Sequence, residues 1–277
     1  MIVKSILTQS RSTDLKRWGK MTNTKYRLIS EDYKKIFGKK LYKIEALKDF
    51  GDVKAGSLGG YIESEDNLSR DGDAWVGGNA MVYSNAVVRD NAWVGGDAWV
   101  GGKARVYGDA YVGDDAYVGD DAYVGDDAMV RDNAVVCNNA RVGGKARVYG
   151  KAMIRDNACV RDNAVVRDNV LVCDNAIVYD NACVRGNARI RDNAMIRDNA
   201  SWLIVGPIGS RDDFTTFVAT ADGGIHVSCG CFSGNIDEFE KAVEKTHAGT
   251  KHEKNYKLAI ELAKSRIVTA EVNENEI

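Results

Sequence analysis

The sequence predicts a mainly β fold in which very short strands alternate with corners to build a stacked coil. Three observations predict it. Ala stands at every sixth position from Ala74 to Ala200, with Val170 as the one exception. Val or Ile follows two residues after each of these positions, up to Ile196. Asp, Asn or Lys precedes each of them, and no helix-period pattern runs through the repeat.

The hexad has a direct physical meaning. Side chains alternate along an extended strand, so the Ala and the Val two residues later point to the same side. The polar pair that follows suits a corner, because Gly, Asp and Asn tolerate positive φ and hydrogen-bond to nearby backbone. We therefore expect Ala and Val to fill a narrow interior, and the residues between them to face outward.

The motif in Val76-Gly77-Gly78-Asn79-Ala80 resembles the hexapeptide-repeat superfamily of left-handed parallel β-helices, and the resemblance covers residues 71–202. It implies triangular coils of three hexads, so that residues 18 apart stack, and it implies a homotrimer. The 22 hexads correspond to about seven coils. The left hand comes from the resemblance alone, since the general crossover rule favours a right hand.

Segments before and after the repeat divide the chain further. We expect an N-terminal extension at 1–22, a β cap and lead-in at 23–70, the β-helix at 71–202 and an α+β module at 203–277. Within the cap, Lys25–Ile29 and Leu41–Ala46 are expected as strands that protect the open end of the solenoid.

The C-terminal module is expected to contain both strands and helices. Residues 201–232 predict two or three strands with a hairpin at 221–224. Helices are expected at Asp237–His247 and Lys254–Ile267, with Asp237 as the N-cap of the first.

Composition excludes several classes of protein. No apolar run is long enough for a membrane span, and six scattered cysteines favour reduced thiols in the cytoplasm of a bacterial host. The net charge is −2. Residues 131–200 hold 12 Lys or Arg against 8 Asp or Glu. This excess of +4 is small for a nucleic-acid-binding stripe, so no nucleic-acid partner is expected.

Outward positions carry many aromatic residues in the first half of the repeat. One interpretation is strand propensity and packing along each ladder. The other is a subunit interface, because large exposed apolar patches mark contacts. The candidate interface residues are Trp75, Trp93, Trp99, Tyr111, Tyr117 and Tyr123.

A second outward row changes from Gly in the first half to Arg in the second, usually within Arg-Asp-Asn. These arginines either pair with the neighbouring Asp or bind an anionic ligand, because a guanidinium suits phosphate. The candidate ligand residues in the repeat are Arg131, Arg155, Arg161, Arg167, Arg185, Arg191 and Arg197.

Acidic pairs recur in residues 113–130, which read GDDAYVGDDAYVGDDAMV. Calcium binding along these carboxylates is one alternative. The other is that Asp acts as a turn former at each corner. Enzymes of the superfamily use His as a general base or as a zinc ligand, and the repeat contains none.

Two motifs in the module, GPIGSR at 206–211 and CGCF at 229–232, resemble a C-terminal module of uncharacterised bacterial and phage hexapeptide-repeat proteins. The spacing of His226, Cys229 and Cys231, with His247 later in the chain, suggests a zinc site, against the alternative of cysteines packed under a helix. Arg211 is a candidate anion contact.

The sequence thus favours a non-enzymatic, phage- or prophage-type solenoid scaffold without a cofactor, which trimerises and presents its C-terminal module for binding. A host protein and an anionic small molecule are the candidate partners. A second hypothesis is a sequestering protein for an anionic small molecule, such as a cyclic nucleotide signal in a counter-defence role. Acyl transfer is a third, disfavoured because the repeat lacks His.

Overall fold

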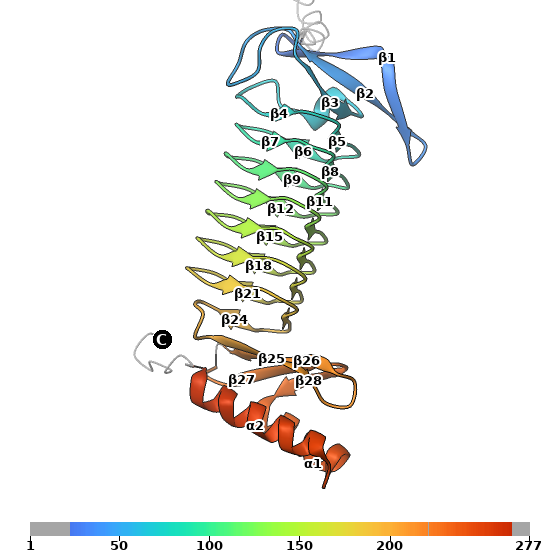
Figure 1. The fold of residues 1–277 in the computed structure, drawn as a ribbon. Helices are drawn as coiled ribbons and strands as arrows, with labels where there is room; N and C mark the ends of the chain where they lie inside the picture. The colour runs from blue at the N-terminus through green and yellow to red at the C-terminus, as the bar shows by residue number, and fades with distance from the viewer. Residues whose placement is uncertain (1–22, 221, 268–277) are drawn as a thin grey trace, which may run out of the picture.

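The computed structural model describes residues 23–220 and 222–267, and it shows a β rod with a cap at one end and a mixed module at the other (Figure 1). The rod is a parallel β-solenoid of about eight turns. This confirms the predicted fold class. The expected N-terminal extension, 1–22, and residues 268–277 lie outside the described residues.

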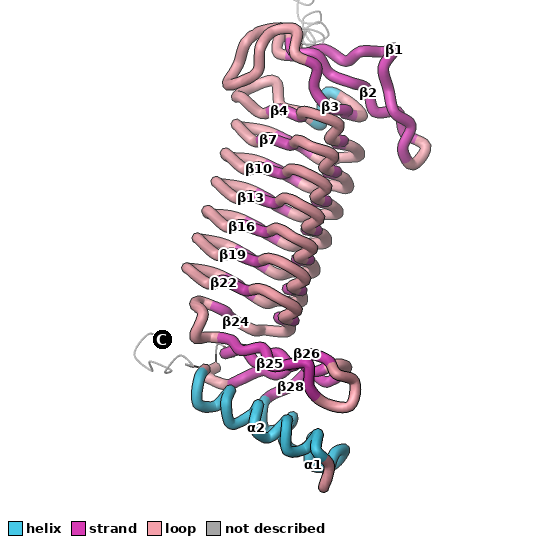
Figure 2. Tube along the Cα trace, viewed as in Figure 1, coloured by secondary structure: helices cyan, strands magenta, loops and turns pink. Residues whose placement is uncertain are grey.

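Each coil contains three strands of two residues, and turn residues make up the rest (Figure 2). The three faces of the rod are three parallel sheets. The strands of the first face are β5 (Met81–Val82), β8 (Trp99–Val100), β11 (Tyr117–Val118), β14 (Val135–Val136), β17 (Met153–Ile154), β20 (Leu171–Val172) and β23 (Arg189–Ile190).

The other two faces have seven strands each. The second face holds β4 (Trp75–Val76), β7 (Trp93–Val94), β10 (Tyr111–Val112), β13 (Met129–Val130), β16 (Arg147–Val148), β19 (Val165–Val166) and β22 (Cys183–Val184). The third holds β6 (Val87–Val88), β9 (Arg105–Val106), β12 (Tyr123–Val124), β15 (Arg141–Val142), β18 (Cys159–Val160), β21 (Ile177–Val178) and β24 (Met195–Ile196).

Residues 18 apart pair directly along each face, as the repeat predicts. Tyr111, for example, pairs with Trp93 on one side and Met129 on the other. The repeat Ala and Val residues form one continuous core and are almost completely buried. Val170 is buried as well, so the single departure from Ala still points inward.

The corners use the two polar residues differently. The first adopts positive φ, as at Asp114, Asp120 and Asp126. Its carboxylate accepts a hydrogen bond from a backbone N–H of the next coil. For example, the N–H of Gly144 donates to the Asp126 carboxylate at 2.9 Å. The second residue stacks side chain on side chain, and Asn157 donates to Asn175 at 3.2 Å. The acidic pairs therefore join one coil to the next.

The cap contributes an extra turn that the hexads do not count. Strands β1 (Tyr26–Ile36) and β2 (Lys39–Ala46) form an antiparallel hairpin, and β2 pairs with β3 (Leu58–Ile62). Strand β3 then pairs in parallel with β5, and Leu68 bridges to Val88 after the short 3-10 helix η2 (Glu65–Asn67). The lead-in is thus the first turn, which is why there are about eight turns and not seven.

Lys25 is the one cation buried under this cap, within the described residues. Its ammonium donates to the carbonyl oxygens of Ala74 (2.8 Å) and Ser69 (3.2 Å) and lies over the Phe50 ring. Burial lowers the pKa of Lys25 from 10.5 to about 8. Between these two values the unfolded chain binds more protons than the folded one, so stability should rise with pH.

Comparing Lys25→Met with the wild type isolates this effect from the other groups that titrate at alkaline pH. Denaturant unfolding at about pH 7 and about pH 9.5 should show the wild type gaining about 1–2 kcal/mol more than the variant. Identical pH dependence in the two proteins would contradict a neutral, buried Lys25 at high pH.

The C-terminal module closes the other end of the rod (Figure 1). Its antiparallel sheet consists of β25 (Trp202–Ile208), β26 (Asp213–Ala219), β27 (Ile225–Cys229) and β28 (Phe232–Asn235), followed by α1 (Ile236–His247) and α2 (Lys251–Arg266). Val218 packs into the solenoid core, whereas Phe217 packs under the helices. Because side chains alternate along β26, this one sheet covers the last coil and also supports both helices.

The first helix starts one residue earlier than expected, and the expected N-cap, Asp237, is wrong by two residues. Its N-cap is Asn235, whose side chain accepts from the backbone N–H of Glu238, while Glu238 accepts from Asn235 N–H in return. Asp237 lies in the first turn instead. The second helix begins at Lys251, earlier than expected, because Thr250 caps it. Neither described helix has the length and hydrophobicity to cross a bilayer.

Candidate functional site

The aromatic residues on the outside of the rod lie over the glycines of the adjacent row. A Cβ added to Gly113 would overlap the ring of Tyr111, and one on Gly119 would overlap that of Tyr117. A Cβ on Gly95 would lie 2.7 Å from the indole nitrogen of Trp93. The Gly row and the aromatic row are therefore one feature, in which small residues make room for flat rings.

The six candidate interface residues lie on all three faces. Trp75, Trp93 and Tyr111 belong to the second face, Trp99 and Tyr117 to the first, and Tyr123 to the third. Trp75 is only 2% exposed, because Phe50 of the cap packs edge-on against it at 5.5 Å between ring centroids. Trp75 is thus part of the cap contact and is removed from the candidate interface.

The first face carries the longest uncharged ladder. Six successive outward positions of the repeat, from Met81 to Leu171, are apolar or aromatic there, and Arg189 ends the ladder. Met81 is buried, and we call the other five the apolar face: Trp99, Tyr117, Val135, Met153 and Leu171. The ladder of the second face is interrupted by Arg147, and that of the third by Arg105 and Arg141. Met153 is 40% exposed.

The arginines of the repeat do not form a single ladder. Hexads alternate around the triangle, so the seven residues divide among three edges of the rod. Arg155 and Arg161 form ion pairs with the next residue, Asp156 at 2.8 Å and Asp162 at 2.7 Å. Arg167 lies 3.8 Å from Asp168, and Arg197 lies 4.0 Å from Asp180. This geometry favours the alternative of local Arg–Asp pairs for these four residues over anion binding along an Arg ladder.

The remaining arginines of the repeat have other surroundings. Arg131 stacks on Tyr149, with its guanidinium 5.4 Å from the ring centroid. The Nε of Arg191 is buried without a hydrogen-bond partner among the described residues. Arg185 lines a cavity of about 540 Å³ at the junction of the rod and the module, together with Trp202 and Arg266.

The structure does not bring His226, Cys229 and Cys231 together at one point. His226 and Cys229 are three residues apart on β27 and therefore point to opposite faces of the sheet. His226 Nε2 lies 3.0 Å from a carboxylate oxygen of Asp192, on the side of the rod. Cys229 lies on the helix side, where it accepts from Thr215 Oγ1 at 3.2 Å. One ion cannot contact both residues.

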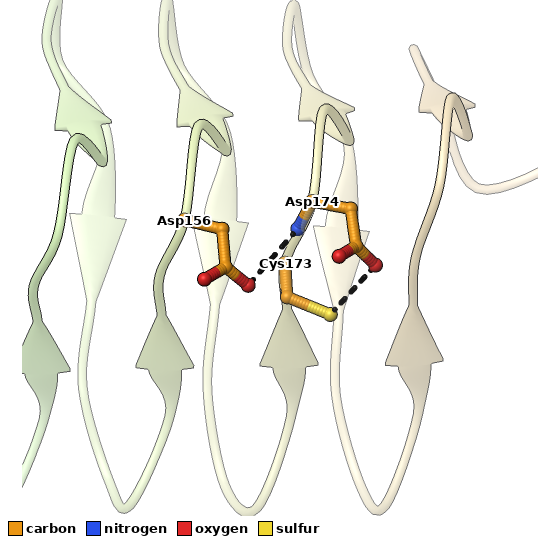
Figure 3. A group of neighbouring side chains, drawn as sticks. All are labelled: Asp156, Cys173 and Asp174. Carbon is orange, nitrogen blue, oxygen red and sulfur yellow. Dashed lines mark hydrogen bonds between the residues drawn. The ribbon is translucent and has the colours of Figure 1, made fainter.

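A different group of potential metal ligands lies on the rod, at Asp156, Cys173 and Asp174 (Figure 3). Cys173 donates to Asp174 at 3.3 Å, and the backbone N–H of Asp174 donates to Asp156 at 3.4 Å. Burial, and then the hydrogen bond to Asp174, raise the pKa of the Cys173 thiol to about 12. Within the described residues the three side chains are joined as a hydrogen-bond chain along the rod.

The C-terminal module contains a cavity of about 440 Å³ that brings the two sequence motifs together. Ser210 and Arg211 of GPIGSR line one side, and Cys229 to Phe232 of CGCF line another. Asp213 of β26 also lines the cavity, and the helices supply the rest of the wall, namely Phe239, Ala242, Val243, Thr246, His247 and Tyr256. We call this space the module cavity.

Tyr256 connects the motifs at the base of the module cavity. Its hydroxyl accepts a hydrogen bond from Cys229 Sγ at 3.6 Å. Gly209 has φ of +82°, and any side chain there would overlap the Tyr256 hydroxyl. Burial and the neighbouring Cys229 raise the pKa of Tyr256 above its usual value, so the phenol stays protonated. Gly209 is therefore required by the close approach of Tyr256.

Sequence reasoning found Arg211, Cys229, Cys231 and His247 but missed Tyr256 as their neighbour. Tyr256 lies on α2, and nothing in the spacing of the motifs points to it. The alternative stated for the cysteines, packing under a helix, holds for Cys229, whereas Cys231 is exposed at the turn. All six cysteines are free thiols.

Comparison with known proteins adds no assignment at this point. No protein-family model matches the chain, and no curated protein compared with it shows significant similarity. The fold and the module cavity are therefore interpreted from their own geometry.

Proposed function

We propose that this protein is a non-enzymatic, left-handed β-solenoid scaffold of the phage or prophage type, which assembles as a homotrimer and presents its C-terminal module for binding. The three-fold assembly, the left hand and the phage type rest on the resemblance to the hexapeptide-repeat superfamily. The observation that carries self-assembly is the apolar face, which extends over five coils without a charge in its outward ladder.

Several features support association through this face. Rows of large apolar side chains on a soluble protein mark contact surfaces. The outward ladders of the other two faces carry arginines between apolar positions, whereas the ladder of the first face carries one only at its end, Arg189. Desolvation of an arginine in an interface is costly. The hairpin of the cap leaves Phe37 75% exposed beside Trp99, so the apolar surface extends onto the cap. A second copy of the chain that covers the apolar face would bury Phe37 together with Trp99.

Val135→Glu should dissociate the assembly, because it places a charge between Tyr117 and Met153 in the middle of the apolar face. The matched control is Val165→Glu on the second face, where Arg147 is an adjacent partner for the new carboxylate. Size-exclusion chromatography with light scattering should show trimers for the wild type and the control, and monomers for Val135→Glu.

Two outcomes would refute the proposal in different ways. A monomeric wild-type protein at micromolar concentration would count against self-assembly itself. Dissociation by Val165→Glu in place of Val135→Glu would keep self-assembly and move the interface to the second face.

The alternatives have less support on the rod. Acyl transfer lacks a general base there, because all three histidines belong to the C-terminal module. Capture of an anionic ligand along the repeat arginines is weakened by their pairing with Asp and by their division among three edges. What remains of the ligand hypothesis is the module cavity.

A further inference from the structure

We propose that the module cavity binds a small compound with a planar ring and a single negative charge, either a carboxylate or a phosphodiester. The proposal goes beyond assembly of the rod, because the cavity is formed within one chain and shares no residue with the apolar face. In this proposal Arg211 binds the charged group of the ligand, and the aromatic side chains of the lining contact its ring.

The anionic end of the ligand is indicated by Arg211. This exposed guanidinium has no ion-pair partner among the described residues, in contrast to Arg155 or Arg161 on the rod. It lies against the CGCF turn, where a Cβ on Gly230 would be 3.9 Å from Arg211 Nη1. A planar guanidinium without a carboxylate partner at the mouth of a cavity suits an anionic group.

The charge of the ligand is limited by the rest of the lining. Arg211 is the only Lys or Arg among the described residues that line the cavity, and Asp213 is also among them. A ligand with two or more negative charges would meet the Asp213 carboxylate without a second cation to compensate it. A monoanion is therefore favoured over a phosphate monoester or a polyphosphate.

The ring of the ligand is indicated by a chain of aromatic side chains. Phe232 and Phe239 lie 5.0 Å apart between centroids, Phe239 and Tyr256 5.5 Å, and Tyr256 and His247 5.5 Å. Such surfaces favour offset or edge-on contact with another ring. The cavity volume of about 440 Å³ lies within the range of about 300–1,000 Å³ typical of small-molecule sites.

Polar groups at the base of the module cavity are held in place before any ligand arrives. Cys229 is hydrogen-bonded to both Thr215 and Tyr256. The Tyr256 hydroxyl occupies the space that a side chain at Gly209 would need. The positive φ of Gly209 and of Gly230 shapes the two loops around this base. A site with fixed polar groups loses less entropy on binding than a flexible one.

Isothermal titration calorimetry with two anionic probes and their uncharged counterparts tests the proposal. Anthranilate represents a ring carboxylate and cyclic AMP a ring-bearing phosphodiester, whereas anthranilamide and adenosine lack the charge. At least one anionic probe should bind, and its counterpart should bind at least about tenfold more weakly. The probe that binds distinguishes the two anion types.

Two variants locate the site. Arg211→Gln should weaken binding of the anionic probe at least about tenfold, because the charged contact is lost. Ala242→Trp should weaken binding of the anionic probe and of its uncharged counterpart alike, since the indole would fill the cavity from α1. Arg197→Gln, an exposed arginine on the rod, is the matched control and should change nothing. Unchanged circular dichroism spectra establish that each variant is folded.

The proposal is overturned if neither anionic probe binds at millimolar concentration, if the uncharged probes bind equally well, or if Arg211→Gln binds like the wild type. Light scattering on the same samples keeps the result separate from the proposed function. A trimer that binds no probe refutes the cavity proposal alone, and a monomer that binds one refutes the assembly alone.

Discussion

Ala122→Phe should destabilise the rod by about 3 kcal/mol or more, the largest effect expected for a single substitution here. Ala122 is fully buried in a central coil, and Ala104 and Ala140 occupy the same position in the adjacent coils. These coils are about 4.8 Å apart, so a phenyl ring has no free space above or below it. Denaturant unfolding followed by circular dichroism measures the loss.

Val165→Phe is the control for this substitution, because it introduces the same side chain at an outward, half-buried position. We expect a change within about 0.5 kcal/mol for the control. Similar stability of the two variants would contradict a closely packed interior. Val170 already shows how much extra volume is accepted, since it adds two methyl groups between the Ala152 and Ala188 layers.

Gly60→Val should detach the cap from the first coil at a cost of about 3 kcal/mol. A Cβ on Gly60 would lie 2.5 Å from the carbonyl oxygen of Ala80 and 2.9 Å from Val76 Cγ1. The backbone cannot move away without breaking the pairing of β3 with β5, which includes Tyr61 and Met81. Hydrogen–deuterium exchange should become faster in β1 to β3 while the central coils stay protected.

Gly143→Val is the matched control for the cap. Gly143 occupies the outward row in which other hexads carry Arg, Tyr or Cys. A Cβ there would lie 3.1 Å from the Asp126 carboxylate, which has to shift only slightly while it accepts from Gly144 N–H. Exchange and stability should therefore match the wild type. Fast exchange throughout the rod of Gly60→Val would show that the cap and the coils unfold together, contrary to the expected local effect.

Much of the rod could be predicted from the sequence for one physical reason. Each residue of a solenoid contacts its equivalents one coil before and after, so a local period of six residues determines almost every long-range contact. The burial of Ala122, the stacking of Tyr111 on Trp93 and the turn role of Asp120 all follow from that period. Six-residue spacing also shows that the repeat arginines alternate among edges, although the Arg ladder hypothesis overlooked it.

Contacts without a period were decided only by the tertiary structure. The lead-in pairs with the first coil at a separation of 20 residues, as in Tyr61 with Met81, so the hexad count cannot include it. The burial of Trp75 depends on Phe50 of the cap, and the separation of His226 from Cys229 depends on which face of β27 meets the rod. The module cavity forms because α1 and α2 bring Tyr256 beneath two loops that are distant in sequence. The rod follows from the amino-acid pattern because its contacts repeat with a fixed period. The cap and the module cavity do not, because each of their contacts occurs once in the chain.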